Sequence, residues 1–297
     1  MRKLKKAAIG MVFMAALALS GAPAEALAVD GVGRISIGDL EILAIDDAKG
    51  QAGKGLIPDL AQHPEYEAIF ERGPLEGVTR TYFFKDGDRA ILVDSGWGQG
   101  GKNPGKTLEI LRAEGVAPEQ ITDVIMTHMD HDHAGGLLKD GAPAFPNAKL
   151  WVSRPEHEAW SGDGMSSRPQ AARDAAKKAF EAYKDRLQLF DFGAEIIPGI
   201  QAVDASGHTP GHTAWRVKSG SDELLILGDL MHVAPVQLPL PGLSSIYDLD
   251  KAKAADARKR LLGQAAENGA VAAGMHFPMI SKVLKRDDGG FMMREPR

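Results

Sequence analysis

Short segments in which apolar and polar residues alternate recur along the chain, and they predict β-hairpins. A period of two places one face of a strand in a core, and the Gly-Asp, Asp-Gly and Ser-Gly pairs between the segments are typical of tight turns. The segments that we expect to be strands of hairpins are residues 34–46, 79–84, 89–93, 195–205, 214–218 and 223–227.

Other segments carry the helical period, and two short apolar runs predict buried strands. We expect helices at residues 106–114, 156–160, 169–189 and 248–267, the last with Asp248 as its N-cap, and buried strands at residues 121–127 and 270–273. Hairpins followed by helices, twice over, predict an α/β protein of the αββα sandwich class. Two mixed sheets would pack together, with helices outside.

Residues 49–77 are rich in glycine and proline and contain one short helical patch, at residues 65–71. Loops of this length usually have a function. The stretch is therefore either a mobile flap over a pocket or a long surface loop, and the sequence leaves both interpretations open.

The first 28 residues have the three parts of a secretory signal peptide. Four basic residues, from Arg2 to Lys6, precede an apolar run at residues 7–19, and Ala26-Leu27-Ala28 forms a cleavage site. The apolar run is shorter than the ~20 residues that a membrane span needs. We expect residues 1–28 to be removed and residues 29–297 to form a single domain. The mature protein would be periplasmic or secreted, without stable membrane association.

The charge of the chain disfavours a nucleic-acid partner. The chain has 35 basic and 40 acidic residues, and residues 1–28 contain four of the basic and one of the acidic residues. The net charge of the mature chain would therefore be −8. Nucleic acids and anionic membranes attract basic surfaces instead. The sequence has no cysteine, so nitrogen and oxygen ligands alone would hold any metal. We expect a small-molecule substrate; the oligomeric state is open, with a homodimer as one option.

Histidine and aspartate residues gather where four apolar strands are expected to end. Three histidines and two aspartates lie within residues 128–133, and further polar groups follow at residues 208–212, 229 and 276. α/β proteins tend to place their chemistry at the carboxyl ends of strands. Such groups are costly to bury unless something binds them, and a divalent metal ion binds both kinds. The clusters therefore predict a metal site at one edge of the sheets.

In the order and spacing of these clusters the chain resembles the metallo-beta-lactamase superfamily. The superfamily signature is H-x-H-x-D-H, then G-H-T-P-G-H, then G-D and a late histidine; the matching segments here start at His128, Gly207, Gly228 and His276. Residues 228–237 look like the methyl parathion hydrolase branch in particular, which also includes lactonase-like and esterase-like relatives. The resemblance implies the metallo-beta-lactamase fold for most of the mature chain.

The resemblance also implies a site for two divalent metal ions, zinc first and manganese or iron as alternatives. Its implied ligands are His128, Asp130 and His208 for one ion and Asp132, His133 and His276 for the other, with Asp229 bridging the two. Asp132 and Asp229 would act in catalysis by holding the attacking water.

Three further histidines lie in or near the motif segments without matching a ligand position. His212 would orient a ligand or help fix the turn, and His232 would either face the pocket or cap a strand. His131 would be peripheral, with a role as an alternative ligand left open by its proximity. A leaving group could be protonated by water, by His212 or by His232.

Asp130 departs from the superfamily pattern, which has histidine at this position. A carboxylate is a harder ligand than imidazole and adds a negative charge, which moves the preference from zinc toward manganese or iron. The flavodiiron proteins of the superfamily carry a carboxylate at the matching position and hold iron. The sequence therefore predicts that the identity of the metal depends on Asp130, and that Asp130→His would shift the preference toward zinc.

The chemistry that the resemblance implies is hydrolysis of an ester, lactone or phosphotriester, because two close metal ions supply hydroxide near neutral pH. A β-lactam hydrolase, and a metal-binding or redox protein on the same fold, are the alternatives. We expect apolar walls that suit an uncharged substrate, formed by Trp97 and residues 49–77, 160–164 and 236–247.

Overall fold

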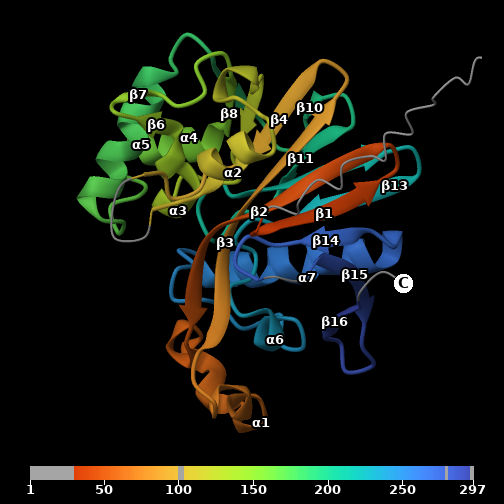
Figure 1. The fold of residues 1–297 in the computed structure, drawn as a ribbon. Coiled ribbons are helices and arrows are strands. Elements are labelled where there is room, and N and C mark those ends of the chain that lie inside the picture. Colours follow the sequence, from red (N-terminus) through yellow and green to blue (C-terminus); the bar gives the residue numbers. More distant parts are fainter. Residues whose placement is uncertain (1–29, 100–103, 278–279, 295–297) are drawn as a thin grey trace, which may run out of the picture.

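Two seven-stranded sheets form the centre of the molecule in a computed structural model that describes residues 30–99, 104–277 and 280–294 (Figure 1). The first sheet has the order β1-β2-β3-β4-β5-β8-β9 and the second the order β10-β11-β12-β13-β14-β15-β16. The strands of the first sheet are β1 (Val32–Ile37), β2 (Leu40–Ala52), β3 (Leu75–Asp86), β4 (Arg89–Val93), β5 (Asp123–Ile125), β8 (Lys149–Ser153) and β9 (Leu187–Phe190). Those of the second are β10 (Glu195–Ile197), β11 (Ile200–Asp204), β12 (Thr213–Ser219), β13 (Asp222–Ile226), β14 (Val271–Ala273), β15 (Ile280–Lys285) and β16 (Phe291–Arg294). A small hairpin pairs β6 (Leu138–Lys139) with β7 (Ala142–Pro143).

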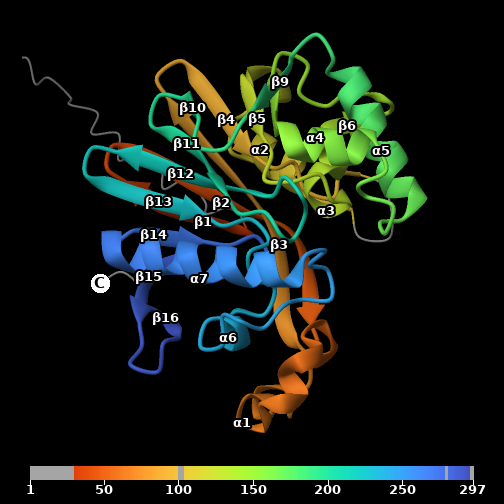
Figure 2. The same ribbon diagram turned by 180° about the vertical axis from the view of Figure 1, so that it is seen from behind.

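Helices cover the outer face of each sheet, as the views from both sides show (Figures 1 and 2). Side chains of α2 (Thr107–Ala113), α4 (Arg154–Ser161) and α5 (Gln170–Ala182) pack on the first sheet, and those of α7 (Lys251–Asn268) pack on the second. The remaining short helices are α1 (Pro64–Glu67), α3 (His131–Ala134), α6 (Ala234–Gln237), η1 (Lys54–Leu56), η2 (Pro58–Gln62), η3 (Ala68–Phe70), η4 (Pro118–Gln120) and η5 (Gly135–Leu137). The predicted αββα sandwich is confirmed.

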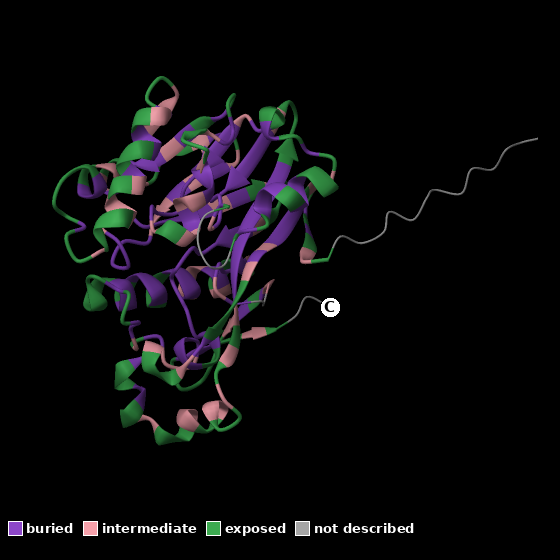
Figure 3. Cartoon of the chain, turned by 60° about the vertical axis from the view of Figure 1, so that its left-hand side comes forward, coloured by how far each residue is buried: buried purple, intermediate pink, exposed green. Residues whose placement is uncertain are grey.

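The inner faces of the two sheets form a common apolar core, seen as the buried centre of Figure 3. Ile42, Tyr82 and Ile91 of the first sheet join Trp215 and Ile226 of the second, and all five are fully buried. Each is flanked along its strand by a residue that faces the outer layer, so the period of two in the sequence corresponds to the two faces of each sheet.

Two helix predictions need correction. The helix predicted at residues 169–189 ends at Ala182, and residues from Leu187 pair with β8 as the parallel edge strand β9. The apolar residues of that end satisfy either period over so short a length, so periodicity could not separate them. The N-cap of α7 is Asp250, whose side chain accepts from Lys253 N, and not Asp248.

Residues 49–77 form an arm that extends the β2–β3 hairpin. The two strands stay paired as far as Ala52 and Leu75, and the residues between them fold into short helical turns at the end of the arm (Figure 1). Ile57 and Leu60 are buried against Val233 and Val236 of the second sheet's loops. The arm is therefore anchored by an apolar contact, unlike a free surface loop.

The predicted signal peptide, residues 1–28, lies outside the described residues. Within the part of the chain that the structure describes, no helix combines the length and the hydropathy needed to cross a membrane.

Candidate metal centre

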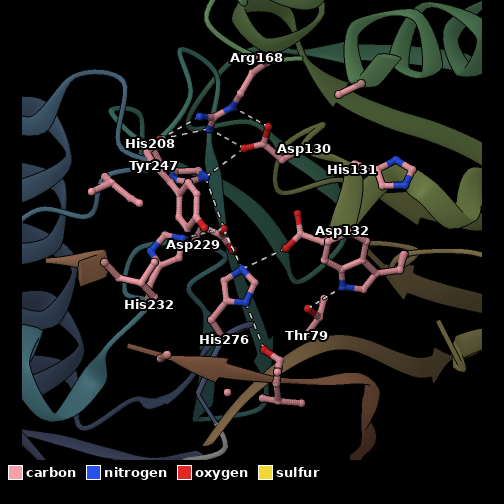
Figure 4. A pocket seen from close by; sticks show the side chains of 18 of the residues that line it. Thr79, Asp130, His131, Asp132, Arg168, His208, Asp229, His232, Tyr247 and His276 are labelled. Carbon is pink, nitrogen blue, oxygen red and sulfur yellow. Dashed lines mark hydrogen bonds and ion pairs between the residues drawn. The ribbon is translucent and has the colours of Figure 1, made fainter. Parts of the chain in front are cut away.

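All seven residues that the sequence singles out as ligands meet at one edge of the two sheets. His128, Asp130, Asp132 and His133 follow β5, His208 follows β11, Asp229 follows β13 and His276 follows β14. Strands β5 and β14 each have a parallel neighbour, and parallel strands end at the same edge of a sheet. Figure 4 shows Asp130, Asp132, His208, Asp229 and His276 pointing toward one another from these ends.

The side chains form two groups that share Asp229. In the first group, Asp229 Oδ2 lies 3.7 Å from His128 Nε2 and 3.4 Å from His208 Nε2. In the second, Asp132 Oδ2 lies 3.6 Å from His133 Nε2 and 3.4 Å from His276 Nε2. Asp229 also lies 3.1 Å from His133 Nε2 through Oδ1 and 3.0 Å from His276 Nε2 through Oδ2. Its carboxylate therefore lies between the two groups.

Each of these four histidines is held by its Nδ1 atom, which leaves Nε2 directed into the cluster. His133 Nδ1 lies 2.7 Å from Asp94 Oδ2 and His208 Nδ1 lies 3.1 Å from Asp248 Oδ1. His276 Nδ1 contacts the Val78 carbonyl at 3.1 Å, and His128 Nδ1 contacts Thr127 Oγ1 at 3.0 Å. Outer carboxylate and carbonyl partners of this kind fix the ring orientation of metal-binding histidines.

The inward atoms lack partners of their own. Among the described residues, His128 Nε2, His133 Nε2, His208 Nε2 and Asp229 Oδ1 are buried without a hydrogen bond. Leaving such an atom unpaired costs about 1–3 kcal/mol, so four together indicate that something else satisfies them. Imidazole nitrogen and carboxylate oxygen are the donors that zinc accepts in tetrahedral or expanded sites. The residues present fit a divalent metal ion in each group.

Comparison with known proteins decides the family. The model of the family described as the metallo-beta-lactamase superfamily matches residues 75–276, which include every residue of the cluster. The chain belongs to the metallo-beta-lactamase superfamily. The sequence prediction of the superfamily and of its fold is thereby confirmed.

Relatives with curated descriptions align over only part of their length. An N-acyl homoserine lactonase from a Bacillus species is 29% identical over 116 residues, 38% of this chain and 40% of the relative. One from Bacillus cereus is 27% identical over 122 residues, 41% of this chain and 43% of the relative. The chain thus matches less than half the length of these lactonases.

Solved structures align over almost the whole chain. The hydrolase AbOPH of the beta lactamase superfamily superposes with a TM-score of 0.82 at 28% identity, covering 91% of this chain and 99% of that one. AidC, a dizinc quorum-quenching lactonase, superposes with a TM-score of 0.81 at 24% identity and covers 90% of this chain and 98% of its own. At so low an identity, this similarity shows the fold alone. The relatives and solved structures that share the superfamily with this chain are described as hydrolases and lactonases. The methyl parathion hydrolase branch stays a prediction.

His212, which follows His208 in the superfamily segment, uses both of its ring nitrogens within the protein. Its Nδ1 donates to the Ala205 carbonyl at 2.9 Å, and its Nε2 accepts from the backbone N–H of Asp229 at 2.9 Å. Burial, with the nearby His208, lowers the pKa of His212 to about 4, in keeping with a neutral ring. His212 therefore positions Asp229 and has no proton to give to a leaving group.

The other two histidines differ in their relation to the cluster. His131 begins α3 and is exposed, with its ring edge against Trp97 at 5.7 Å between centroids, so it is peripheral as predicted. His232 faces the cluster: its Nε2 lies 3.3 Å from Asp229 Oδ2, and its ring stacks on His276 with 5.0 Å between centroids. Burial lowers the pKa of His232 below its usual value. The sequence left open whether His232 faces the pocket or caps a strand, and in the structure its side chain faces the pocket.

Glu156 joins the two loops that carry His128 and His208, and sequence reasoning placed it only in a helix. Its Oε1 accepts from the Met129 N–H at 2.9 Å and from Trp160 Nε1 at 2.7 Å, whereas its Oε2 accepts from Thr209 Oγ1 at 2.6 Å and from the Gly211 N–H at 2.9 Å. The residue is 1% exposed. Three of the four donors come from the two loops, so the buried carboxylate holds these loops together, and Trp160 of the same helix holds the carboxylate in place.

A cavity of about 670 Å³ opens over the cluster. The arm contributes Ala52 and Leu56 to its wall, and Trp97, Ile246 and Tyr247 add further apolar surface, as predicted for these segments; Val78, just beyond the arm, also lines it. Residues 160–164 were expected in the wall but are absent from it: Trp160 is buried in the core of the first sheet. Residues 167–169 and Ala172 take that place. The walls suit an uncharged group beside the polar cluster.

Gly228 permits the close approach of His212 to the strand end, and its replacement should be costly. Its φ is +57°, and a Cβ there would lie 2.4 Å from His212 Nε2. Gly220 is the matched control, because it has a similar φ of +59° but open space around its missing Cβ. We expect Gly220→Ala to lose about 1–2 kcal/mol of stability from the left-handed backbone alone. Gly228→Ala should lose clearly more and also lower the metal content. Denaturant unfolding and metal analysis of both variants would measure this, and equal losses would contradict the contact.

Proposed function

We propose that this chain hydrolyses an uncharged lactone that carries an apolar arm, with the aid of two divalent ions, zinc first. The proposal is supported by one observation above all: four histidine Nε2 atoms and three carboxylates converge beneath a cavity with apolar walls. His128, Asp130 and His208 would hold one ion, and Asp132, His133 and His276 the other, with Asp229 between them. When bound, such a pair supplies Lewis acidity and an activated water.

The chain's own groups would do the orienting. The backbone of Asp229 is fixed by His212, and its carboxylate lies between the two groups, where it can hold a water. Asp132 is the half-buried carboxylate of the second group and lines the cavity, so its Oδ2 can accept a proton from the water and return it to the leaving oxygen. The apolar walls would exclude other water molecules from the bound substrate.

Two considerations support a lactone rather than another ester. Curated relatives are N-acyl homoserine lactonases, and an N-acyl homoserine lactone is a small cyclic ester with an apolar acyl arm. Leu56, Val78, Trp97 and Ile246 provide apolar surface beside the cluster for such an arm. A phosphotriester or aryl ester would use the same water and is the second candidate, since residues 228–237 resemble the methyl parathion hydrolase branch.

The test is a substrate panel measured before and after removal of metal. N-acyl homoserine lactones of increasing acyl length, a phosphotriester, an aryl ester and the β-lactam nitrocefin would be offered to the purified protein. We expect lactone turnover that a chelator abolishes and zinc restores. Turnover of the phosphotriester alone would replace the lactone by the second candidate, nitrocefin turnover would favour the β-lactam alternative, and activity that survives full chelation would reject the metal-dependent mechanism.

Ala172 offers a direct probe of the proposed acyl site. It lines the cavity from α5, whereas the adjacent Ala171 is exposed and outside the cavity wall. We expect Ala172→Phe to lower kcat/KM for long-chain lactones about tenfold, with a small effect on short-chain ones, because the larger side chain would occupy space needed by the arm. Ala171→Phe is the matched control. An equal effect on all chain lengths would place the arm elsewhere.

We also propose that residues 1–28 direct export and are then removed. The expected result is that protein recovered from the periplasm or the medium begins at Val29, as N-terminal sequencing would show. Retention of Met1 on protein that has reached either compartment would reject the cleavage.

A further inference from the structure

Asp130, the residue that departs from the superfamily pattern, is paired with an arginine. Arg168 Nε donates to Asp130 Oδ1 at 2.8 Å and Arg168 Nη2 donates to Oδ2 at 2.6 Å, a two-pronged pair (Figure 4). Both side chains are largely buried, with 13% and 15% of their surface exposed. Arg168 lies between α4 and α5, where its backbone N–H closes a turn on Met165. Nothing in the superfamily motif includes it.

The paired carboxylate still faces the histidines of the first group. Asp130 Oδ2 lies 3.2 Å from His208 Nε2 and 3.5 Å from His128 Nε2. The two N–H donors of Arg168, one on each carboxylate oxygen, are the partners that an ionised carboxylate accepts. A carboxylate has about four lone-pair directions, so two bonds to Arg168 leave others free to point toward the cluster.

Arg168 also fixes one wall of the cavity. Its Nη1 and Nη2 atoms donate to the carbonyl of Tyr247 at 3.1 Å and 3.2 Å. The ring of Tyr247 lies over His232, with 5.5 Å between centroids. One guanidinium thus connects a side chain of the metal cluster to the segment that forms the apolar wall.

The charges of the pair explain its presence. The superfamily's histidine is a neutral ligand, whereas Asp130 alone would add one negative charge to a group that already contains Asp229. Arg168 adds one positive charge at hydrogen-bond distance. We propose that Arg168 is a positioning residue that makes Asp130 the electrostatic equivalent of a neutral histidine, so that the first position keeps the zinc preference of a histidine site. This proposal rests on the proposed function in one respect only, that the cluster binds metal.

A stabilising role for the fold is a weaker explanation. Buried ion pairs recover little more than the cost of removing two charges from water, and apolar replacements are often as stable. The pair also lies in the cavity wall, at the residue where a ligand is expected, and not in one of the apolar cores. The position of the Asp130–Arg168 pair therefore favours a role in metal binding over a role in fold stability.

The experiment is a double-substitution cycle that measures zinc affinity by competition with a chromogenic chelator. Asp130→His alone leaves the guanidinium of Arg168 uncompensated beside the cation, so we expect zinc at the first position to bind about 10–100-fold more weakly. Adding Arg168→Met removes that charge, and the double variant should regain most of the affinity. Arg168→Met alone exposes the full charge of Asp130 and should raise the share of manganese bound from an equimolar zinc–manganese mixture.

Controls separate folding from metal binding. Arg216→Met removes a similarly buried arginine, which pairs with Glu223 far from the cavity, and should leave zinc affinity and metal choice unchanged. If Asp130→His does not fold, the cycle can be repeated with Asp130→Asn, which places a neutral group of the same shape at this position. This variant would be measured alone and in combination with Arg168→Met. Equal zinc affinities of the Asp130 variant with and without Arg168 would overturn the proposal. Wild-type protein that binds zinc but hydrolyses no lactone would overturn the proposed substrate and leave this cycle intact.

Discussion

Replacing Asp229 by asparagine should lower kcat/KM by about a thousandfold, a loss typical of removing a group that stabilises developing charge or a metal-activated water. The carboxylate lies between the two groups of ligands, with oxygen atoms 3.0–3.7 Å from four histidine Nε2 atoms. An amide of the same shape has no charge and presents N–H donors in place of one oxygen. The backbone contact with His212 does not involve the side chain, so the fold should persist.

Kinetics on the accepted lactone and metal analysis of the same preparation would measure this prediction. Asp256→Asn, an exposed carboxylate of α7, is the matched control and should be neutral. A loss smaller than about tenfold for Asp229→Asn, with full metal content, would show that Asp229 is not needed between the two groups.

Replacing Glu156 by glutamine should cost several kcal/mol of stability, about 1–3 kcal/mol for each buried donor left unpaired. Each oxygen of Glu156 accepts two donors. The glutamine amide can accept with one atom only, so two of the four donors lose their partner. Because three of the four donors, Met129, Thr209 and Gly211, belong to the loops around His128 and His208, metal content should fall together with stability.

Denaturant unfolding of the metal-free protein isolates the first effect, and titration with zinc measures the second. Glu158→Gln, on the exposed face of the same helix, is the control. Unchanged unfolding of Glu156→Gln would mean that the loops are held together by other contacts, such as the Ser153 Oγ bond to the Gly211 carbonyl.

The sequence predicted those parts of the site that are written as motifs. His128, Asp132 and His133 are neighbours along the chain, and His208, Asp229 and His276 each follow an apolar strand. Strand ends are readable from periodicity, and the superfamily pattern supplies their order. The sandwich followed from the same signals, because alternation within the hairpins assigns one face of each strand to the shared core.

The groups that support the ligands could not be predicted in this way. Asp94, Glu156, Arg168 and Asp248 are single residues without a recurring spacing, and each meets its partner only through the tertiary fold. Asp248 was assigned to a helix cap, a local role that its side chain gives up for His208 Nδ1. One signal was available for Asp94: it precedes a Gly-rich segment at a strand end. Its φ of +57° is unusual for a residue other than glycine and is typical of functional sites.

The predicted effect of Asp130 on the metal also changes with the structure. On sequence alone the extra carboxylate moves the preference toward manganese or iron, and Asp130→His moves it toward zinc. With Arg168 paired to that carboxylate, the single substitution is expected to weaken zinc binding, because it leaves a buried cation without its negatively charged partner.

The ligands are divided unequally between the two sheets, and this division affects the unfolded chain. His128, Asp130, Asp132 and His133 lie within one short stretch after β5, together with His131, whereas His208, Asp229 and His276 come from the second sheet. The short stretch keeps its imidazoles and carboxylates together without any tertiary structure, so the denatured ensemble retains affinity for the ion. A metal stabilises a protein only by the difference between its binding to the native and the unfolded states. Under the proposed function, a gain in thermal stability from zinc would therefore reflect mainly the three distant ligands, and His131, which lies outside the native cluster, would compete for the ion only in the unfolded chain.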